Sequence, residues 1–481
     1  MNDELPTDTY ENFVRRFSKA FREAHEAVLT AATSGKDIPK HFDYPKVELR
    51  SNGLPYFSSF SLNTEQAPNY YAGLVQSRGL LGLFAPAYDK TFAEIESLTD
   101  YLNSAPLLKS RLSNGYTEDV SSWRVRALIF DCVDRYTSLY GLEAISSDKE
   151  RKTLRPIVDC ILFNRLDVAL IVPIALTRFA ADRFSLGPDN FVCRMGRTFQ
   201  LSRARLGAHG SGAVEGVVEA ATHAFVSVGW SLENTSEFDV NSSLRQVPEE
   251  ATTLIEAFFA ALRMATGIDT GYAQVIFAPR KWALNYYCDL PVLYGSGHRR
   301  YPSSFDRYGW VDPYIRMVSK AEAQEVSEAF QRIRVRTERK IEIAVKRLNS
   351  CLTRDDAIDA ILDATIGLEV LLGDNENQAL SYKLRLRAAA LAGLIGKAKP
   401  EQVLEDIKAV YAVRSEIVHG QSKKSTKTVD ATERYSKQRD LAALQLRLVL
   451  DALLYHPRYL SPELIDKELL LPNPTQAKHT C

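Results

Sequence analysis

Residues 400–420, "PEQVLEDIKAVYAVRSEIVHG", give the clearest fold signal in the C-terminal part of the chain. Pro400 suits the first helical turn, where its missing N–H is not needed, and Gly420 suits a left-handed cap after the last turn. On a helical wheel of about 100° per residue, the apolar side chains fall on one stripe centred near Ile407. That stripe contains Val403, Leu404, Val410, Tyr411 and Val418. The stretch therefore predicts a helix over 400–419 that packs one face against neighbouring helices.

One charged side chain falls on this apolar stripe. Arg414 lies about 20° from its centre on the same wheel, and a guanidinium removed from water needs a negative partner. The sequence "DAILDATIGLEVLLG", residues 359–373, predicts a preceding helix. Its apolar stripe passes through Ile361, Thr365 and Leu368, and Glu369 falls on the same side. We predict that Glu369 holds Arg414, directly or through the adjoining helices.

His419 is the last residue before Gly420. Helix capping alone accounts for a basic last turn followed by glycine. The alternative interpretation is a catalytic pair, since histidine transfers protons at physiological pH and arginine can brace a phosphate. Capping does not explain Arg414 on an apolar stripe, and this position favours the catalytic interpretation.

The rest of the chain predicts two regions of different fold class. Residues 1–313 mix helical and strand patterns and predict an α+β region, with a further subdivision near residue 45. Within it, "DRFSLGPDNFVCRM" at 182–195 predicts a hairpin, and "YGSGHRRYPSSFDRYGWVDP" at 294–313 predicts a segment that joins two domains. Residues 320–456 predict an all-α bundle of four or five helices, over 320–352, 355–373, 379–396, 400–419 and 428–455. Residues 457–481 predict an irregular tail.

Composition excludes several protein classes. The 481 residues are 45% hydrophobic and 25% charged with a net charge of zero, which excludes a disordered or fibrous chain and a whole-molecule electrostatic attraction for nucleic acid. The start is acidic and polar, and the longest apolar segment, 160–176, is interrupted by Arg165 and Asp167. We therefore expect a cytoplasmic protein with no membrane partner.

Cysteine and histidine spacing predicts neither a disulfide framework nor a metal site. The six cysteines include no C-x-x-C pair, and the histidines lack the close spacing of metal ligands. A metal site would need ligands that converge from distant positions. The sequence therefore predicts no metal and no cofactor.

Three blocks in order resemble the HEPN domain, in particular its ApeA-like branch. They are "ATIGLEVLLG" (364–373), "LSYKLRLRAAALAG" (380–393) and "VYAVRSEIVHG" (410–420). The resemblance covers residues 320–456, under a third of the chain, and implies a HEPN-like helical bundle. Family members dimerise, and the R-x4-6-H motifs of two copies meet to form a metal-independent site that cleaves RNA.

Carried onto this chain, the resemblance assigns Arg414 and His419 as catalytic residues. Ser415 stands where active members often carry Asn, Asp or His. Glu369, Tyr411 and Arg387 match recurring positions and receive a supporting role. The implied function is an endoribonuclease of bacterial antiphage defence that stops growth after infection, with a phage-derived trigger sensed by the N-terminal region.

The partners that follow are RNA, with tRNA among the candidates, and a second copy of the chain in a homodimer or higher homo-oligomer. Residues 331–354 carry eight Lys or Arg against two Asp or Glu, and Lys423, Lys424 and Lys427 follow the motif. These lysines are predicted to track RNA phosphates, although a solvated loop explains them equally well.

Two other functions are compatible with the sequence. The helical domain is then either a catalytically inactive HEPN-like binding or dimerisation module, or a structural part of an unrelated enzyme whose site lies in the α+β region.

Overall fold

The computed structural model describes residues 7–60, 64–77, 87–88, 91–112, 119–206, 212–374, 379–419 and 428–471. The fold is α+β, as the sequence predicted. The chain divides into two compact units, each assembled from several segments. The first comprises Met1–Pro173, Arg194–Val247 and Gln274–His298, and the second comprises Ile174–Cys193, Pro248–Ala273 and Arg299–Cys481.

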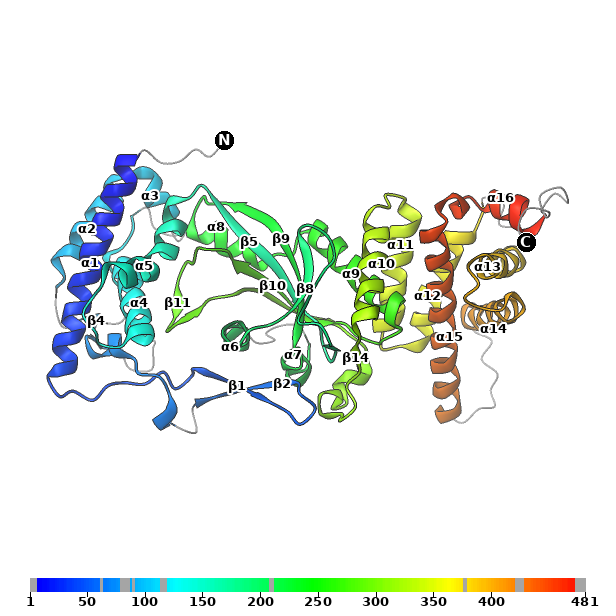
Figure 1. Ribbon diagram of the computed structural model, residues 1–481, viewed down its shortest axis with the longest axis horizontal. Coiled ribbons are helices and arrows are strands. Elements are labelled where there is room, and N and C mark those ends of the chain that lie inside the picture. The colour runs from blue at the N-terminus through cyan, green and yellow to red at the C-terminus, as the bar shows by residue number, and fades with distance from the viewer. Residues whose placement is uncertain are drawn as a thin grey trace. The chain divides into compact units, whose positions relative to one another are not determined.

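Helices form one core of the first unit. Figure 1 shows them side by side, and their bounds are α1 Thr7–Thr33, α2 Ala93–Ser104, α3 Pro106–Arg111, α4 Ser122–Tyr140 and α5 Ser147–Leu162. Phenylalanines recur at helical spacing along α1, so they share one face of that helix. The core includes Phe13, Phe17, Phe21, Leu98, Ile129 and Ile157. The apolar spacing of α1 and α4 thus produces the packing of this core.

Four strands of the first unit hydrogen-bond in the order β13-β10-β5-β9. Their bounds are β5 Arg165–Pro173, β9 His223–Glu233, β10 Tyr272–Pro279 and β13 Tyr294–Arg300. Strand β5 pairs antiparallel with both β9 and β10.

The short helices of this unit are α6 Arg197–Leu206, α7 Glu215–Glu219 and α8 Glu237–Arg245. The smaller antiparallel pairs are β1 Pro45–Leu49 with β2 Pro55–Ser59, β3 Gln76–Ser77 with β4 Ala87–Tyr88, and β11 Tyr286–Tyr287 with β12 Leu290–Pro291.

The segment 294–313 passes from the first unit to the second between His298 and Arg299, as predicted, but its first part, Tyr294–Arg300, is strand β13. Its glycine content reflects close backbone packing and not a flexible connection. Gly295 has φ +138°, and a Cβ there would lie 2.1 Å from the carbonyl oxygen of Val275 in β10. A strand with a side chain at this position could not approach its neighbour.

The second unit combines segments from the middle of the chain with the C-terminal helices. The predicted hairpin at 182–195 is confirmed as β7 Arg183–Ser185 and β8 Asn190–Arg194. Strand β6 Arg178–Phe179 pairs in parallel with β14 Met317–Val318. Helix α9, Glu249–Thr266, packs against the first two helices of the C-terminal region, α10 Lys320–Arg334 and α11 Arg339–Thr353.

A buried cation ties these segments together. Arg263 of α9 is 1% exposed and donates hydrogen bonds to the side-chain oxygen of Asn349 in α11 and, at 2.5 Å, to the carbonyl oxygen of Thr270. Asn349 in turn donates to the carbonyl oxygen of Glu256 at 2.8 Å. Burial lowers the pKa of Arg263 to about 10. The C-terminal helices therefore depend on residues from 248–273 for part of their packing.

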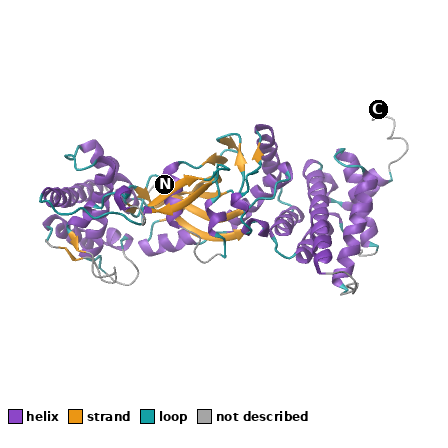
Figure 2. Cartoon of the chain, turned by 90° about the horizontal axis from the view of Figure 1, so that it is seen from below, coloured by secondary structure: helices purple, strands orange, loops and turns teal. Residues whose placement is uncertain are grey.

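The remaining helices follow the sequence prediction closely. They are α12 Ala357–Leu372, α13 Leu380–Ile395, α14 Pro400–Val418 and α15 Thr428–Tyr455, and Figure 2 shows this part of the chain as helices joined by loops. The predicted helix over 320–352 is wrong in one respect, since it divides into α10 and α11. After α15, short helical turns occupy Pro457–Leu460, Pro462–Ile465 and Asp466–Leu470. Among the described helices, none is both long and apolar enough to cross a membrane.

Gly295→Ala tests the strand assignment of β13. Its methyl group would collide with the Val275 carbonyl in addition to straining the backbone, so we expect a loss of about 2–4 kcal/mol in unfolding free energy. Gly187→Ala is the matched control, because Gly187 has φ +147° but no atom within 4 Å of its Cβ position. The control should lose only about 1–2 kcal/mol. Urea unfolding of the two full-length variants measures the difference, and equal losses would contradict the packing of β13.

Candidate functional site

The sequence-predicted ion pair is present at the end of α14. Arg414 Nη2 lies 3.4 Å from Glu369 Oε1 of α12. The same carboxylate oxygen accepts a hydrogen bond of 3.2 Å from the hydroxyl of Tyr411, one turn before Arg414. Burial and the Glu369 carboxylate together raise the pKa of Tyr411, which keeps its hydroxyl protonated as a donor. Glu369 thus connects two side chains of α14 to α12.

Arg414 lies at the border of the buried face and not at its centre. Its side chain is 35% exposed and that of Glu369 is 23% exposed. The stripe residues Val403, Ile407, Val410 and Tyr411 are buried, as predicted, but Val418 is 53% exposed and Val413 is buried instead. Near its end the packed face of α14 therefore turns toward Val413. A pair this exposed contributes at most about 1 kcal/mol to stability, and part of the guanidinium remains open to an anion from solvent.

His419 is exposed and forms the C-cap of α14. Its backbone N–H donates to the carbonyl oxygen of Ser415 at 3.0 Å, which fixes the last turn. Gly420, the predicted left-handed cap, lies outside the described residues. Five positions along a helix rotate a side chain by about 140°, so Arg414 and His419 leave α14 in different directions. One copy of the chain does not close a site around both groups by helix geometry alone.

The other predicted site residues differ in their surroundings. Ser415 is exposed beside Arg414. Arg387 of α13 is buried and donates to the carbonyl oxygen of Leu372 at 2.8 Å, to Asp374 at 2.9 Å and to Asp466 at 2.6 and 2.8 Å. Hydrogen bonds to these carboxylates raise its pKa. Arg387 therefore joins α13 to the end of α12 and to the turns after α15.

The basic residues expected to contact RNA are only partly described. Lys423, Lys424 and Lys427 lie outside the described residues. Within the basic segment 331–354, Arg347 and Arg354 both bind Asp363, a buried carboxylate of α12. These two arginines therefore serve helix packing, because Asp363 would otherwise be a buried charge without compensation.

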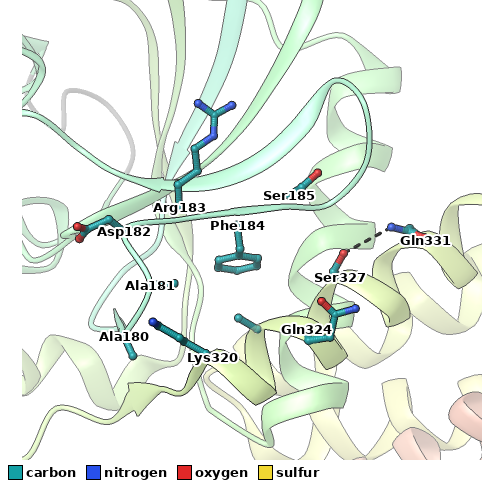
Figure 3. Close-up of a pocket in the computed structure, with 11 residues that line it drawn as sticks. Ala180, Ala181, Asp182, Arg183, Phe184, Ser185, Lys320, Gln324, Ser327 and Gln331 are labelled. Atoms are coloured by element: carbon teal, nitrogen blue, oxygen red, sulfur yellow. Dashed lines mark hydrogen bonds between the residues drawn. The ribbon is translucent and has the colours of Figure 1, made fainter.

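A cavity in the second unit lies on residues that the sequence prediction did not select. It has a volume of about 700 Å³, and Figure 3 shows the Phe184 ring pointing from the β7 segment toward α10. Lys320, Gln324, Ser327 and Gln331 of α10 line its other side. The lining includes neither Arg414 nor His419 and carries no histidine or cysteine, so this cavity is separate from the motif.

Three side chains of the first unit converge in a way that spacing in the sequence could not indicate. His41, Asp134 and Cys288 are buried, and their ligand atoms all lie within 4.8 Å of one another. His41 Nε2 lies 3.2 and 3.0 Å from the two carboxylate oxygens of Asp134, although the residues are 93 positions apart. Among the described residues, this is the group whose donor atoms could hold a metal ion.

Comparison of the chain with protein-family models, with curated proteins and with solved structures gave no match.

Truncation of Arg387 should cost much more stability than truncation of Arg414. Arg387→Ala leaves Asp466 and the Leu372 carbonyl without this donor and leaves Asp374 with Lys383 alone, so we expect a loss of about 3 kcal/mol in unfolding free energy. Arg414→Ala removes one partly exposed pair and should cost less than about 1 kcal/mol. Urea unfolding of both full-length variants provides the measurement. A large loss for Arg414→Ala would mean that this residue maintains the fold, and would remove the reason for placing it in a functional site.

Proposed function

We propose that the protein is a metal-independent endoribonuclease of the HEPN type that acts in bacterial antiphage defence. The C-terminal helices α10–α15 would form its HEPN-like domain, with Arg414 and His419 as catalytic residues. The single observation that carries the proposal is the environment of Arg414. The half-buried guanidinium of Arg414 is paired with Glu369, and helix packing does not otherwise account for an arginine there. It lies one turn before His419, an exposed histidine at the end of α14.

The chemistry follows from the two side chains. A neutral His419 takes the proton of an RNA 2′-hydroxyl, and the oxygen attacks the adjacent phosphorus atom. Arg414 stabilises the negative charge that develops on the pentacoordinate phosphate. The P–O5′ bond breaks, a protonated histidine gives its proton to the leaving oxygen, and the products are a 2′,3′-cyclic phosphate and a 5′-hydroxyl end. No metal enters these steps.

A second copy of the chain supplies what one copy lacks. The acid and the base are both required in one turnover, and a single exposed His419 serves only one role at a time. An isologous dimer that joins the ends of two α14 helices places two copies of the motif in one site. The exposure of Val418, Ser415 and His419 on this face is compatible with such a contact.

Glu369 provides a way to regulate the access of phosphate to Arg414. It competes with phosphate for Arg414, but the pair is 3.4 Å long and partly exposed, so an incoming phosphate can exchange with it. We further propose that the N-terminal region restrains cleavage until a phage-derived trigger is present. Deleting residues 1–310 is not a clean test of that restraint, since it removes α9 and the β7–β8 hairpin, which belong to the same compact unit as α10–α15.

The test of the function uses the full-length protein in EDTA. Wild type should degrade RNA and stop the growth of a host that expresses it. Arg414→Ala and His419→Ala should each lower the cleavage rate by a factor of roughly 100 or more, because each removes a group that acts in the transition state. The readout is the integrity of total RNA on denaturing gels together with host growth.

His456→Ala is the matched control, since His456 follows the last turn of α15 as His419 follows that of α14. It should cleave at the wild-type rate. Equal activity of the folded Arg414→Ala, His419→Ala and wild-type proteins would overturn the assignment. Activity that EDTA abolishes and that survives both substitutions would favour an enzyme whose site lies elsewhere in the chain, and inactivity of folded wild type would favour a binding module.

A further inference from the structure

Separate parts of the first unit supply three different ligand types to one buried point. His41 lies in the segment before β1, Asp134 lies in the middle of α4, and Cys288 lies in the turn between β11 and β12. Their exposed fractions are 4%, 5% and 2%. A nitrogen, an oxygen and a sulfur donor therefore meet away from bulk solvent, within 4.8 Å of one another.

The spacing of the donor atoms already approaches that of a tetrahedral metal site. Two N or O ligands at about 2.0–2.1 Å from Zn²⁺ lie roughly 3.3 Å apart, and a thiolate lies about 3.6 Å from each of them. The His41 nitrogen is 3.0 and 3.2 Å from the Asp134 oxygens. The Cys288 sulfur has to approach by at most about 1.2 Å to complete the set. A rotation of one side chain covers that distance.

Each donor is held by its surroundings. The backbone N–H of His41 donates to Pro68 at 2.9 Å, and the imidazole ring lies 4.7 Å from the ring of Tyr70 and 5.1 Å from that of Tyr287, centroid to centroid. Ser138 lies one helical turn after Asp134, so both face the same side of α4. Its hydroxyl is 2.9 Å from the Cys288 sulfur.

Cys288 occupies a turn position that ordinarily favours other residues. Residues 288 and 289 form the two-residue loop of the β11–β12 hairpin, and Cys288 has φ +56°. Such positions favour Gly, Asn or Asp, and another residue there costs about 1–2 kcal/mol. The conformation directs the thiol inward, to the His41–Asp134 pair. Turn formation does not account for a cysteine here; Cys288 packs in a small core cluster with Tyr44, Leu201 and Leu290, and a ligand role adds a reason for its thiol.

Charge balance points to a divalent cation. A cysteine binds a metal ion as the thiolate and therefore gives up its thiol proton. Binding of a dication displaces this proton. The thiolate and the Asp134 carboxylate then neutralise the ion, with a neutral imidazole as third ligand, and the buried site carries no net charge.

We propose that His41, Asp134 and Cys288 bind one Zn²⁺ ion that clamps the segment before β1, helix α4 and the β11–β12 hairpin together. A mixed nitrogen, oxygen and sulfur set suits Zn²⁺, whereas Mg²⁺ and Ca²⁺ require oxygen ligands. The fourth tetrahedral position is left to a non-protein ligand. This clamp is separate from the proposed cleavage site, so chelation should lower the stability of the first unit without being a step in RNA cleavage.

The test titrates chelator-treated, full-length protein with Co²⁺ alone. We expect one equivalent to bind, with a near-ultraviolet thiolate-to-cobalt charge-transfer band and visible bands of tetrahedral intensity. Zn²⁺ should then abolish both signals and raise the thermal unfolding midpoint. These signals come from the metal itself and do not depend on any enzymatic activity, so their failure is distinct from a failure of the proposed function.

Two substitutions and one control locate the site. Cys288→Ser should eliminate the charge-transfer band, and His41→Gln should weaken Co²⁺ binding by roughly tenfold or more. Cys160→Ser, at another buried free cysteine of the first unit, should bind as wild type does. Absence of the band in wild type overturns the proposal even if a variant fails to fold. A band that survives Cys288→Ser, or that Cys160→Ser removes, also overturns it.

Discussion

The buried guanidinium of Arg263 is the constraint on which the second unit depends. A guanidinium with 1% exposure needs hydrogen-bond acceptors, and its two Nη atoms donate to Asn349 of α11 and to the Thr270 carbonyl, whereas its Nε has no hydrogen-bond partner among the described residues. Removal of any one segment would leave the cation or its partners unpaired. The helices that carry the proposed cleavage site are for this reason not an independent C-terminal piece, and residues 248–273 are part of their structure.

Two arginines of the C-terminal helices, Arg387 and Arg414, have contrasting surroundings. Arg387 has its hydrogen-bonding directions taken up by Asp374, Asp466 and a backbone carbonyl, and it maintains the fold. Arg414 has a long ion pair to Glu369 and is about one third exposed. Only the second arrangement leaves a guanidinium that can exchange its partner for a phosphate. The proposed catalytic role belongs to Arg414 on this physical ground, in addition to its place in the motif.

Sequence periodicity predicted the C-terminal helices well because their signals are local. Apolar spacing, Pro400 and the short polar connections fixed the bounds of α12–α15 to within a few residues, and the wheel placed Glu369 on the side of Arg414. Sequence periodicity failed where the contacting residues are far apart in the chain. Gly295 of β13 was assigned to a segment between domains, because the sequence does not show that the Val275 carbonyl lies next to it in space. The convergence of His41, Asp134 and Cys288 was missed for the same reason, since no short spacing connects them.

Cleavage by attack of the 2′-hydroxyl is tested most directly by changing the RNA substrate at the cleaved position. An RNA that wild-type protein cuts at a mapped position is resynthesised with a single 2′-deoxyribose on the 5′ side of that phosphate, and both RNAs are incubated with the protein in EDTA. We expect the unmodified RNA to yield a 2′,3′-cyclic phosphate and a 5′-hydroxyl end, and the substituted position to resist cleavage. Cleavage at the deoxy position, or products that carry a 5′-phosphate, would contradict this mechanism.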